Sequence, residues 1–432
     1  MRKPRRVPLP VFLAPNQLFE RVRRRHRHSF LLESRGGPKR LARYSVIGFG
    51  PREFFHDRRG GDPLELAREV VRQHQVAYDP GFPGGLVGAI AYDAVHHFDA
   101  PTHRRRAPHY LFGLYTDAIV YNHLEGSVSY VTLDEDRSQD VVDAAEARPG
   151  PSRELRIGRV RSNTSRAEFG DMVRETQRRI RDGETYQTVL SRRFDATYSG
   201  ELGRLYDTIR VHNPSPYMYD LDFGPTRILG SSPEMLVRVE KGTVETFPIA
   251  GTRPLGRSPA EDGRLKRSLL ADPKENAEHI MLVDLARNDV GRVAETGSVR
   301  VPEYRKIESY SSVHHMVSRV TGRLKKGLDG FDAFRSIFPA GTVSGAPKIR
   351  AMQIIDELEK EPRGFYAGSV CYFGLNGDLD SAITIRTLVA TEDALSVQAG
   401  AGIVQDSVPG REFDETQHKA NSILGFLGRN GA

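Results

Sequence analysis

The alternation of apolar and polar positions predicts a chain built from both helices and strands. Apolar residues recur every three or four positions over residues 165–183 and 347–360, which is the period of a helix that buries one face. Residues 186–198 predict a strand, and three short β-rich runs follow between 368 and 404. Gly, Asn and Asp turns separate these runs and favour antiparallel hairpins over a Rossmann-type alternation of strand and helix.

The first part of the chain carries short β-like runs with glycine-rich turns, for example at 83–95 and 110–122. The stretch 134–158 is polar, charged and interrupted by two prolines, which is typical of a boundary. We therefore expect two regions, 1–150 and 151–432.

Composition is that of an ordinary soluble protein, with 38% hydrophobic and 28% charged residues in a chain of 432. Pro8, Pro10 and Pro15 interrupt the apolar stretch at the N-terminus, so it is typical neither of a signal peptide nor of a membrane helix. The single cysteine, Cys371, excludes an internal disulfide framework and a cysteine-built zinc site. We expect a cytoplasmic protein with no membrane partner.

The net charge of +7 leaves two kinds of partner open. A nucleic acid would bind the basic runs at 21–28 and 103–108, whereas a small anionic substrate would suit a basic surface equally well. Because the rest of the positive excess is spread along the chain, an arginine-rich surface is favoured and no nucleic-acid partner is expected.

Two glutamates near the start of a predicted helix are candidate metal ligands. The helix begins after Asp272, and Glu275 and Glu278 share one face with Leu282 and Leu285, the face expected to pack into the core. Two anions that point inward need a cation. Glu275 is equally well placed to cap the helix, so this spacing alone leaves both interpretations open.

A second pair, Glu412 and Glu415, lies at the start of a helix predicted over 408–427. Glu415 could instead form an ordinary surface pair with Lys419, four residues on. Four carboxylates on two helices offer the hard oxygen ligands that Mg²⁺ prefers. We expect no cluster of Cys and His to compete for a softer metal, so Mg²⁺ is the predicted cofactor.

A series of motifs in one order resembles the chorismate-binding enzymes. In the C-terminal half they are SPE (232–234), FPIAGTRPLGR (247–257), DPKENAEHIMLVDLARND (272–289), SSVHHMVS (311–318), FPAGTVSGAPKIRAMQIIDELE (338–359), RGFYAG (363–368), DSAITIRT (380–387), QAGAGIVQDSVP (398–409) and ETQHKA (415–420). Three looser matches in the first half are similar to the large subunits of anthranilate synthases: LLES (31–34), FPGGLVGAIAYD (82–93) and NPSPYM (213–218). The resemblance implies an α+β fold with two facing, largely antiparallel β-sheets flanked by helices.

The resemblance also assigns roles. It implies that the two glutamate pairs hold Mg²⁺ against the ring carboxylate of chorismate. The implied catalytic residues are His315, a general acid for the departing ring C4 hydroxyl, Glu234, a carboxylate near the reacting face, and Thr252. The implied substrate-binding residues are Thr342, Gly345, Tyr366, Arg386, Gly400, Gly402 and Lys419. Arg386 is suited to a bidentate grip on the pyruvyl carboxylate.

Two positions indicate which chorismate reaction follows. Relatives that add water have a lysine general base where this chain has Gln187, and aminodeoxychorismate synthases of the usual type have a nucleophilic lysine where it has Ala250. Direct attack by ammonia then remains, giving anthranilate and pyruvate. The alternative is an aminodeoxychorismate synthase component I, or a relative that releases the aminated intermediate. Since nothing here resembles a glutaminase, we expect a separate glutamine amidotransferase subunit, anthranilate synthase component II, as the ammonia source.

The looser motifs imply feedback control by tryptophan. LLES and NPSPYM are where anthranilate synthases bind this inhibitor; otherwise they are a strand end and a turn. The candidate contacts are Glu33, Ser34, Pro216, Tyr217 and Met218. Region 1–150 is accordingly expected to be regulatory and partner-contacting, and region 151–432 to bind chorismate. Cys371 stands where the family usually has glycine and narrows the space beside substrate or inhibitor, so tight inhibition is less expected.

Overall fold

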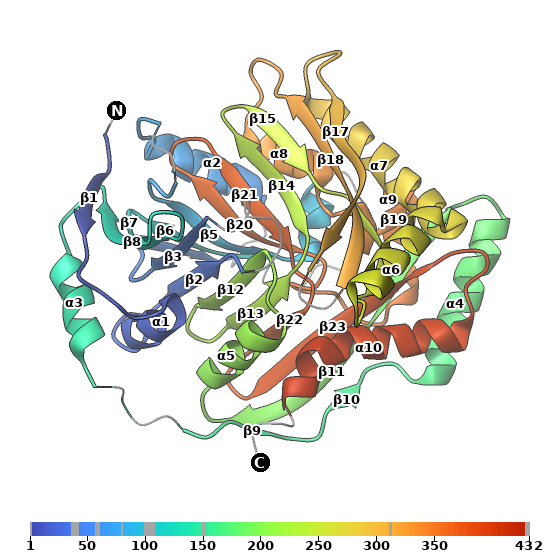
Figure 1. Cartoon of the computed structure of the whole chain (residues 1–432), viewed down its shortest axis with the longest axis horizontal. Coiled ribbons are helices and arrows are strands. Elements are labelled where there is room, and N and C mark those ends of the chain that lie inside the picture. Colours follow the sequence, from blue (N-terminus) through green and yellow to red (C-terminus); the bar gives the residue numbers. More distant parts are fainter. Residues whose placement is uncertain are drawn as a thin grey trace.

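The computed structural model describes residues 2–35, 43–56, 61–78, 81–98, 109–148, 150, 153–310 and 313–427. Two antiparallel sheets form the centre of the molecule, and helices lie around them (Figure 1). The expected α+β fold is therefore confirmed.

The larger sheet has 13 strands within the described residues, in the order β1-β8-β7-β3-β2-β12-β13-β22-β23-β11-β10, with β9 and β19 also paired to β11. Its strands are β1 (Arg5–Pro8), β2 (Ser29–Glu33), β3 (Tyr44–Gly48), β7 (Asp117–Asn122), β8 (Ser127–Thr132), β9 (Arg156–Ile157), β10 (Arg161–Ser162), β11 (Gln187–Ser199), β12 (Tyr217–Asp222), β13 (Arg227–Ser232), β19 (Gly345–Ala346), β22 (Thr387–Ala390) and β23 (Ala394–Ile403).

The smaller sheet has ten strands within the described residues, in the order β16-β18-β15-β14-β21-β20-β5-β6-β4, with β17 paired to β18. Its strands are β4 (Glu53–His56), β5 (Gly85–Ile90), β6 (Tyr110–Tyr115), β14 (Met235–Glu240), β15 (Thr243–Thr246), β16 (Ile249–Pro254), β17 (Arg300–Ser309), β18 (Val313–Arg323), β20 (Ser369–Gly374) and β21 (Leu379–Ile383).

The sequence division at residue 150 does not fall between the sheets. In the larger sheet β2, from the first region, pairs with β12, from the second, and in the smaller sheet β5 pairs with β20. Both sheets therefore need both regions of the chain, and the separate roles expected for 1–150 and 151–432 stay a prediction.

An apolar layer joins the sheets face to face. Phe30 of β2 meets Tyr115 of β6 edge to face, with ring centroids 4.6 Å apart, and Val87 and Ala89 of β5 lie in the same buried cluster. Their neighbour Leu86 belongs to the cluster on the other side of β5. This period-two alternation is expected of a strand buried on both faces.

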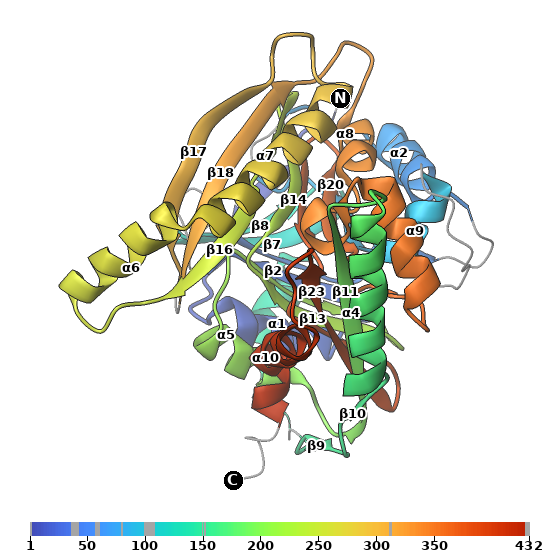
Figure 2. The same ribbon diagram turned by 90° about the vertical axis from the view of Figure 1, so that its right-hand side faces the viewer.

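Helices cover the outer faces of both sheets (Figures 1 and 2). The larger sheet packs against α1 (Pro15–Arg23), α3 (Ser138–Glu146), α5 (Gly203–His212) and α10 (Pro409–Leu427), and α4 (Arg166–Arg181) packs on α10 and β11. The smaller sheet packs against α2 (Pro63–Gln73), α7 (Pro273–Val293) and α8 (Gly330–Ile337), whereas α9 (Lys348–Leu358) packs on β11 and β19 of the larger sheet. The short helix α6 (Pro259–Ala271) precedes α7, and two 3-10 turns are η1 (Tyr92–His97) and η2 (Gly341–Val343).

Residues of the basic run at 21–28 make ion pairs and stacking contacts within the molecule. Arg23 pairs with Glu20 and Asp222, and Arg24 pairs with Glu201. His28 stacks on Phe54 with centroids 4.1 Å apart. These contacts favour an arginine-rich folded surface over a nucleic-acid site; residues 103–108 lie outside the described residues. Among the helices that are described, none combines the length and hydropathy needed to cross a bilayer.

The close contact between β5 and β6 gives a stability prediction. A Cβ atom added at Gly88 would lie 1.8 Å from the carbonyl oxygen of Leu111, and the strands cannot separate without losing the layer between the sheets. We expect Gly88→Ala to lower the free energy of unfolding by about 3 kcal/mol in urea denaturation. The exposed Gly291 of α7 has open space around it, so Gly291→Ala should instead leave stability unchanged or raise it by about 0.5 kcal/mol. Equal stability of the two variants would contradict this packing.

Candidate functional site

The first predicted ligand pair lies on the inner face of α7. The Asp272 carboxylate caps this helix by accepting hydrogen bonds from the backbone N–H groups of Lys274 and Glu275, at 3.0 and 3.3 Å. Further along this face, Leu285 lies so close to Gly341 that a Cβ there would be 2.1 Å from a Leu285 methyl group. The predicted helix is thus confirmed, and its glutamates share the face that packs against the turn η2.

The same two lysine side chains influence carboxyl groups on both α7 and α10. Burial raises the pKa of Glu278, and the charge of Glu275 raises it further, whereas Lys274 and Lys419 lower it. Burial likewise raises the pKa of Glu412 on α10, and the same two lysines lower it. Because lysines from both helices influence carboxylates of both, the two ligand pairs face one another across the site.

Protein cations hold these carboxylates in the present structure. Glu415 pairs with Lys419 at 2.8 Å, and Glu275 pairs with Arg253 at 3.2 Å. Within the described residues, no three of the four glutamates bring their oxygens within 4.8 Å of one another. The donor set still fits a hard divalent cation, because Glu275 and Glu278 repel each other in a partly buried setting and supply only oxygen ligands.

His315 lies on β18 directly opposite Thr252 of β16. Its Nδ1 is 2.9 Å from the carbonyl oxygen of Gly251 and 3.2 Å from the Thr252 hydroxyl. Since a carbonyl can only accept, Nδ1 carries the hydrogen and Nε2 is left for the site. Burial lowers the pKa of His315, and the nearby Arg386 adds to this effect. The free protein therefore holds a neutral imidazole at neutral pH.

Glu234 and Arg386 lie at the two places where the chain passes from one sheet to the other. Glu234 falls between β13 and β14, and Arg386 falls between β21 and β22. The crossovers are side by side, since the N–H of Ile383 donates to the Glu234 carbonyl and the N–H of Ser231 donates to the Arg386 carbonyl, both at 3.1 Å. Arg386 adopts a left-handed backbone conformation, with φ of 49°. A left-handed conformation is uncommon for a residue other than glycine, and such conformations are concentrated at functional sites.

Glu234 and Arg386 also interact electrostatically with other residues of the site. Burial raises the pKa of Glu234 to about 7, while the Thr342 hydroxyl, Arg386 and Lys419 lower it. Burial lowers the pKa of the Arg386 guanidinium, and the Glu234 and Tyr310 side chains oppose that shift. Glu234, Thr342, Arg386 and Lys419 thus form one group of interacting side chains drawn from four separate stretches of sequence.

The predicted glycines lie where a side chain would fill the site. A Cβ at Gly402 would be 2.5 Å from the Gln187 amide nitrogen, and one at Gly400 would be 2.6 Å from the Tyr366 hydroxyl. Lys419 donates to the Gly400 carbonyl at 3.1 Å. Gly345 has φ of 138° and pairs with β11 one residue from Gln187.

Gln187 itself belongs to the ligand region. Its side-chain amide lowers the pKa of the Glu278 carboxyl. Ala250 is buried on β16, immediately before Gly251, and pairs with Met316 of β18. The two positions that discriminate between chorismate reactions therefore both border the site.

Sequence reasoning missed Tyr310. Its ring lies edge to face against His315, with centroids 5.4 Å apart, and its hydroxyl donates to Glu308 at 3.3 Å. Tyr310 lies three positions before the first residue of the VHHMVS motif, and the hairpin between β17 and β18 returns it to His315.

The expectation of no competing histidine cluster was wrong. His96, His97 and His109 each bring a ring nitrogen within 4.8 Å of the others. The sequence gives no ligand-type spacing for this set, because strand pairing rather than helical period brings His109 to the other two.

The five candidate inhibitor contacts, Glu33, Ser34, Pro216, Tyr217 and Met218, line a single cavity of about 310 Å³ between the sheets. Strand pairing places them together, since Glu33 of β2 lies opposite Met218 of β12. Arg210 holds the buried Glu33 carboxylate through two nitrogens, and the Tyr206 hydroxyl donates to it at 3.0 Å.

Two further observations describe this cavity. Cys371 also lines it, so the position where the family usually has glycine faces this space. The hydroxyl oxygen of Ser34 is buried and makes no hydrogen bond with the part of the chain that the structure describes.

Comparison with known proteins gives a consistent result. The family described as chorismate binding enzyme matches residues 27–425. Anthranilate synthase component 1 of Methanothermobacter thermautotrophicus is 47% identical, over 96% of this chain and 92% of that protein. The protein of the same description from Aquifex aeolicus is 42% identical, over 95% and 91%.

Solved structures agree with these relatives. The crystal structure of anthranilate synthase component I from Streptococcus pneumoniae superposes with a TM-score of 0.80 at 37% identity, over 88% of this chain and 92% of that one. The menaquinone-specific isochorismate synthase from Escherichia coli superposes with a TM-score of 0.78, over 98% and 94%, but at 22% identity it shows a likeness of fold alone.

The raised pKa of Glu234 predicts a pH-dependent stability. The unfolded carboxyl has its ordinary pKa near 4.5 and the folded one a pKa of about 7, so folding takes up a proton between these values. Stability then falls as pH rises through that window, at up to about 1.4 kcal/mol per pH unit from this group. We expect Glu234→Gln to remove this slope in urea denaturation at pH 5 and pH 7.5, whereas the exposed Glu392→Gln should leave it in place. Parallel pH profiles for wild type and Glu234→Gln would rule the shift out.

Proposed function

We propose that this chain, which belongs to the chorismate binding enzyme family, is a lyase that converts chorismate and ammonia into anthranilate and pyruvate. The observation that carries the proposal is the similarity, at 40–47% identity and over most of the chain, to proteins described as anthranilate synthase component 1. The site is in keeping with it, since Gln187 and not a lysine adjoins Glu278. Glutamine cannot deprotonate water, so addition of water is disfavoured.

The reaction balances as chorismate plus ammonia giving anthranilate, pyruvate and water. A C–N bond forms at ring C2 and the C4–O bond breaks, with the departing hydroxyl leaving as water once it takes a proton. Pyruvate is then eliminated and the ring becomes aromatic. The protein has to position a dianion, exclude competing water and supply a proton at C4.

The residues of the two crossovers and their neighbours suit the first task. Arg386 offers two parallel N–H donors to the pyruvyl carboxylate, and Lys419 adds a second cation beside it. Glu275, Glu278, Glu412 and Glu415 would hold Mg²⁺, which supplies charge neutralisation for the ring carboxylate when bound. Gly400 and Gly402 have no side chain, so the face of β23 beside Tyr366 and Gln187 stays open to the chorismate ring.

His315 and Glu234 are suited to proton transfer. Nε2 of His315 is neutral in the free protein, and a bound dianion would favour its protonation, so that the imidazolium can donate to the C4 hydroxyl. Thr252 and the Gly251 carbonyl fix the ring through Nδ1. With a pKa of about 7, Glu234 can hold or release a proton at neutral pH on the same side of the site.

Ammonia would come from a separate glutamine amidotransferase subunit, in keeping with the words "component 1" in the names of the relatives. The cysteine of this chain cannot serve as a glutaminase nucleophile, because Cys371 is buried in β20 and burial raises the pKa of its thiol. Free ammonia should replace the partner at alkaline pH. We place this reaction in the cytoplasm.

Tryptophan is the proposed occupant of the cavity between the sheets, with region 1–150 supplying much of the regulatory wall. Asp380, Ser381 and Ala382 of β21 line this cavity and lead directly into the crossover that carries Arg386. A ligand that shifts β21 would therefore reach the chorismate site through continuous backbone.

An ammonia-dependent assay tests the reaction. Chorismate, Mg²⁺ and ammonium at alkaline pH should give anthranilate fluorescence and an equal amount of pyruvate. We expect His315→Ala to lower kcat by about 10²–10⁴-fold, since it removes the proton donor. Glu275→Gln should raise the Mg²⁺ concentration needed for half-maximal activity by at least about tenfold.

Matched controls separate these effects from loss of fold. His212→Ala, at the exposed C-terminal end of α5, and Asp284→Asn, on the exposed face of α7, should retain wild-type rates. An aminated product without pyruvate would favour the alternative reaction, and wild-type rates in both site variants would overturn the site.

Tryptophan titration tests the cavity. If the buried Ser34 hydroxyl bonds the inhibitor, Ser34→Ala should raise the inhibition constant about tenfold, the value of one hydrogen bond of about 1.4 kcal/mol. Cys371→Gly should lower it several-fold by widening the cavity. The exposed Ser127→Ala on β8 is the control and should keep the wild-type inhibition constant. Full activity of the wild-type enzyme in the presence of tryptophan would contradict the regulatory proposal.

A further inference from the structure

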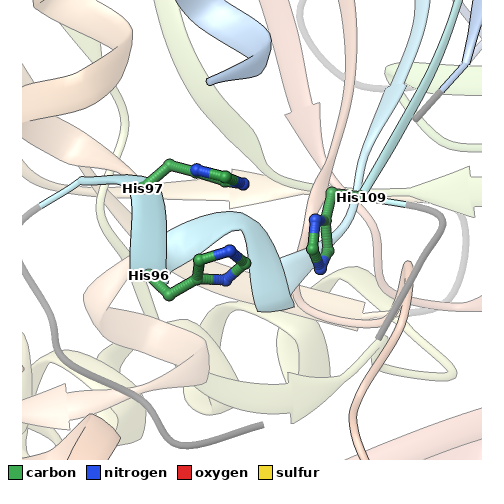
Figure 3. Close-up of side chains that lie close together, drawn as sticks. All are labelled: His96, His97 and His109. Carbon is green, nitrogen blue, oxygen red and sulfur yellow. The ribbon is translucent and has the colours of Figure 1, made fainter. Parts of the chain in front are cut away.

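Three imidazoles converge where η1 and the start of β6 meet, and none of the three belongs to the residues assigned to chorismate. His96 and His97 end the turn η1, and His109 directly precedes β6. Figure 3 shows the three rings turned toward one another. Their centroids are 3.9, 4.6 and 5.4 Å apart, and one nitrogen of each ring lies within 4.8 Å of the other two.

Strand register builds this cluster. Ile90 and Tyr110 are the last pair of β5 and β6, and the next pair continues with the N–H of Ala91 donating to the His109 carbonyl at 2.7 Å. The turn η1 starts at once after Ala91, which brings His96 and His97 back over His109. The backbone that carries the cluster is thus fixed on both sides.

The His96 ring is oriented as metal-bound imidazoles commonly are. Its Nδ1 lies 2.6 Å from the Asp93 carbonyl oxygen, which can only accept, so Nδ1–H donates and Nε2 keeps its lone pair for the cluster. A backbone carbonyl on the second nitrogen is the usual means of fixing the tautomer and direction of a histidine ligand.

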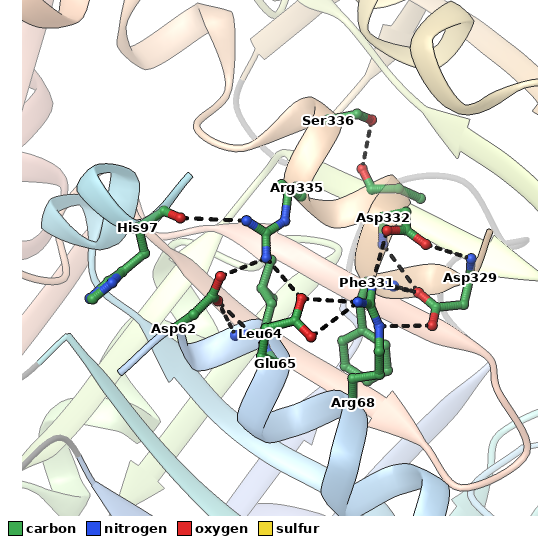
Figure 4. A network of polar contacts seen from close by, with 11 residues as sticks. Asp62, Leu64, Glu65, Arg68, His97, Asp329, Phe331, Asp332, Arg335 and Ser336 are labelled. Atoms are coloured by element: carbon green, nitrogen blue, oxygen red, sulfur yellow. Dashed lines mark hydrogen bonds and ion pairs between the residues drawn. The ribbon is translucent and has the colours of Figure 1, made fainter. Parts of the chain in front are cut away.

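Ion pairs anchor the same turn from outside. Arg335 of α8 donates to the His97 carbonyl at 3.4 Å, and its other nitrogen pairs with Asp62 at 2.6 Å and with Glu65 at 3.2 Å. Figure 4 shows this network joining α2, α8 and η1. Because the end of η1 is held, His97 does not have to be ordered when a ligand binds, and less entropy is lost.

We propose that His96, His97 and His109 form a binding site for a late first-row divalent cation such as Zn²⁺, separate from the carboxylate site for Mg²⁺. Three neutral imidazoles suit Zn²⁺, Cu²⁺ or Ni²⁺ and are poor ligands for Mg²⁺, which prefers oxygen. Water completes the coordination. His109 is buried, and His96 and His97 are half-buried, so the cation has access from solvent.

The role of this site is structural. A bound cation would join the end of η1 to the start of β6, and the adjacent Phe98 packs edge to face on Phe338, with centroids 5.6 Å apart. An ion that binds the folded state and not the unfolded chain stabilises the folded state by mass action.

Metal binding to the full-length chain tests the proposal without any enzyme assay. The chain is stripped with chelator and titrated with ZnCl₂ in millimolar MgCl₂, which occupies the carboxylates. Wild type and the control His123→Gln, an exposed histidine on the β7–β8 turn, should bind one Zn²⁺ per chain. His96→Gln and His109→Gln should bind it at least about 100-fold more weakly. Co²⁺ in place of Zn²⁺ should give a visible absorption band in the first two proteins alone.

Thermal unfolding gives an independent readout. Zn²⁺ should raise the melting temperature of wild type and of His123→Gln, and not that of His96→Gln, whose half-buried side chain can be replaced without emptying the core. Zn²⁺ binding of equal strength in wild type and in His96→Gln, or no stoichiometric binding in wild type, would overturn the proposal.

Discussion

Packing of the two sheets against each other is the constraint on which the candidate chorismate site and the cavity between the sheets both depend. Phe30, Tyr115 and their neighbours pack between the sheets, and the chain passes from one sheet to the other at the ends of neighbouring interior strands, from β13 to β14 and from β21 to β22. Glu234 and Arg386 lie on two of these passages. A carboxylate and a guanidinium that are far apart in sequence therefore share one buried corner, where burial and mutual charge set their proton affinities.

The same packing relates the cavity to the site. Strands β12, β20 and β21 bring Met218, Cys371 and Ala382 around one space between the sheets, and the last of these strands continues to Arg386. Region 1–150 supplies β2 and region 151–432 supplies the strands opposite. The cavity and the candidate site thus share one continuous framework, although the sequence suggests two regions in series.

Repulsion among carboxylates determines the charge balance at the part of the site that α7 and α10 form. Glu278 and Glu412 are half-buried beside like charges, and the charges of Lys274 and Lys419 lower the pKa of both carboxyls. In the free chain these lysines and Arg253 balance the charge. A divalent cation has to displace part of that pairing, so metal and anionic substrate are expected to favour each other's binding.

The sequence by itself determined the elements and the chemistry that follows from local period. Helix spacing put Glu275 with Glu278, and Glu412 with Glu415, on single faces, and motif order identified the family and the meaning of Gln187 and Ala250. Only the tertiary structure decided the long-range adjacencies: Glu234 beside Arg386, Tyr310 against His315, and the convergence of His96, His97 and His109. The physical reason is register. A helix fixes which side chains share a face within a few residues, whereas the partner of a strand residue depends on pairing that the local sequence does not encode.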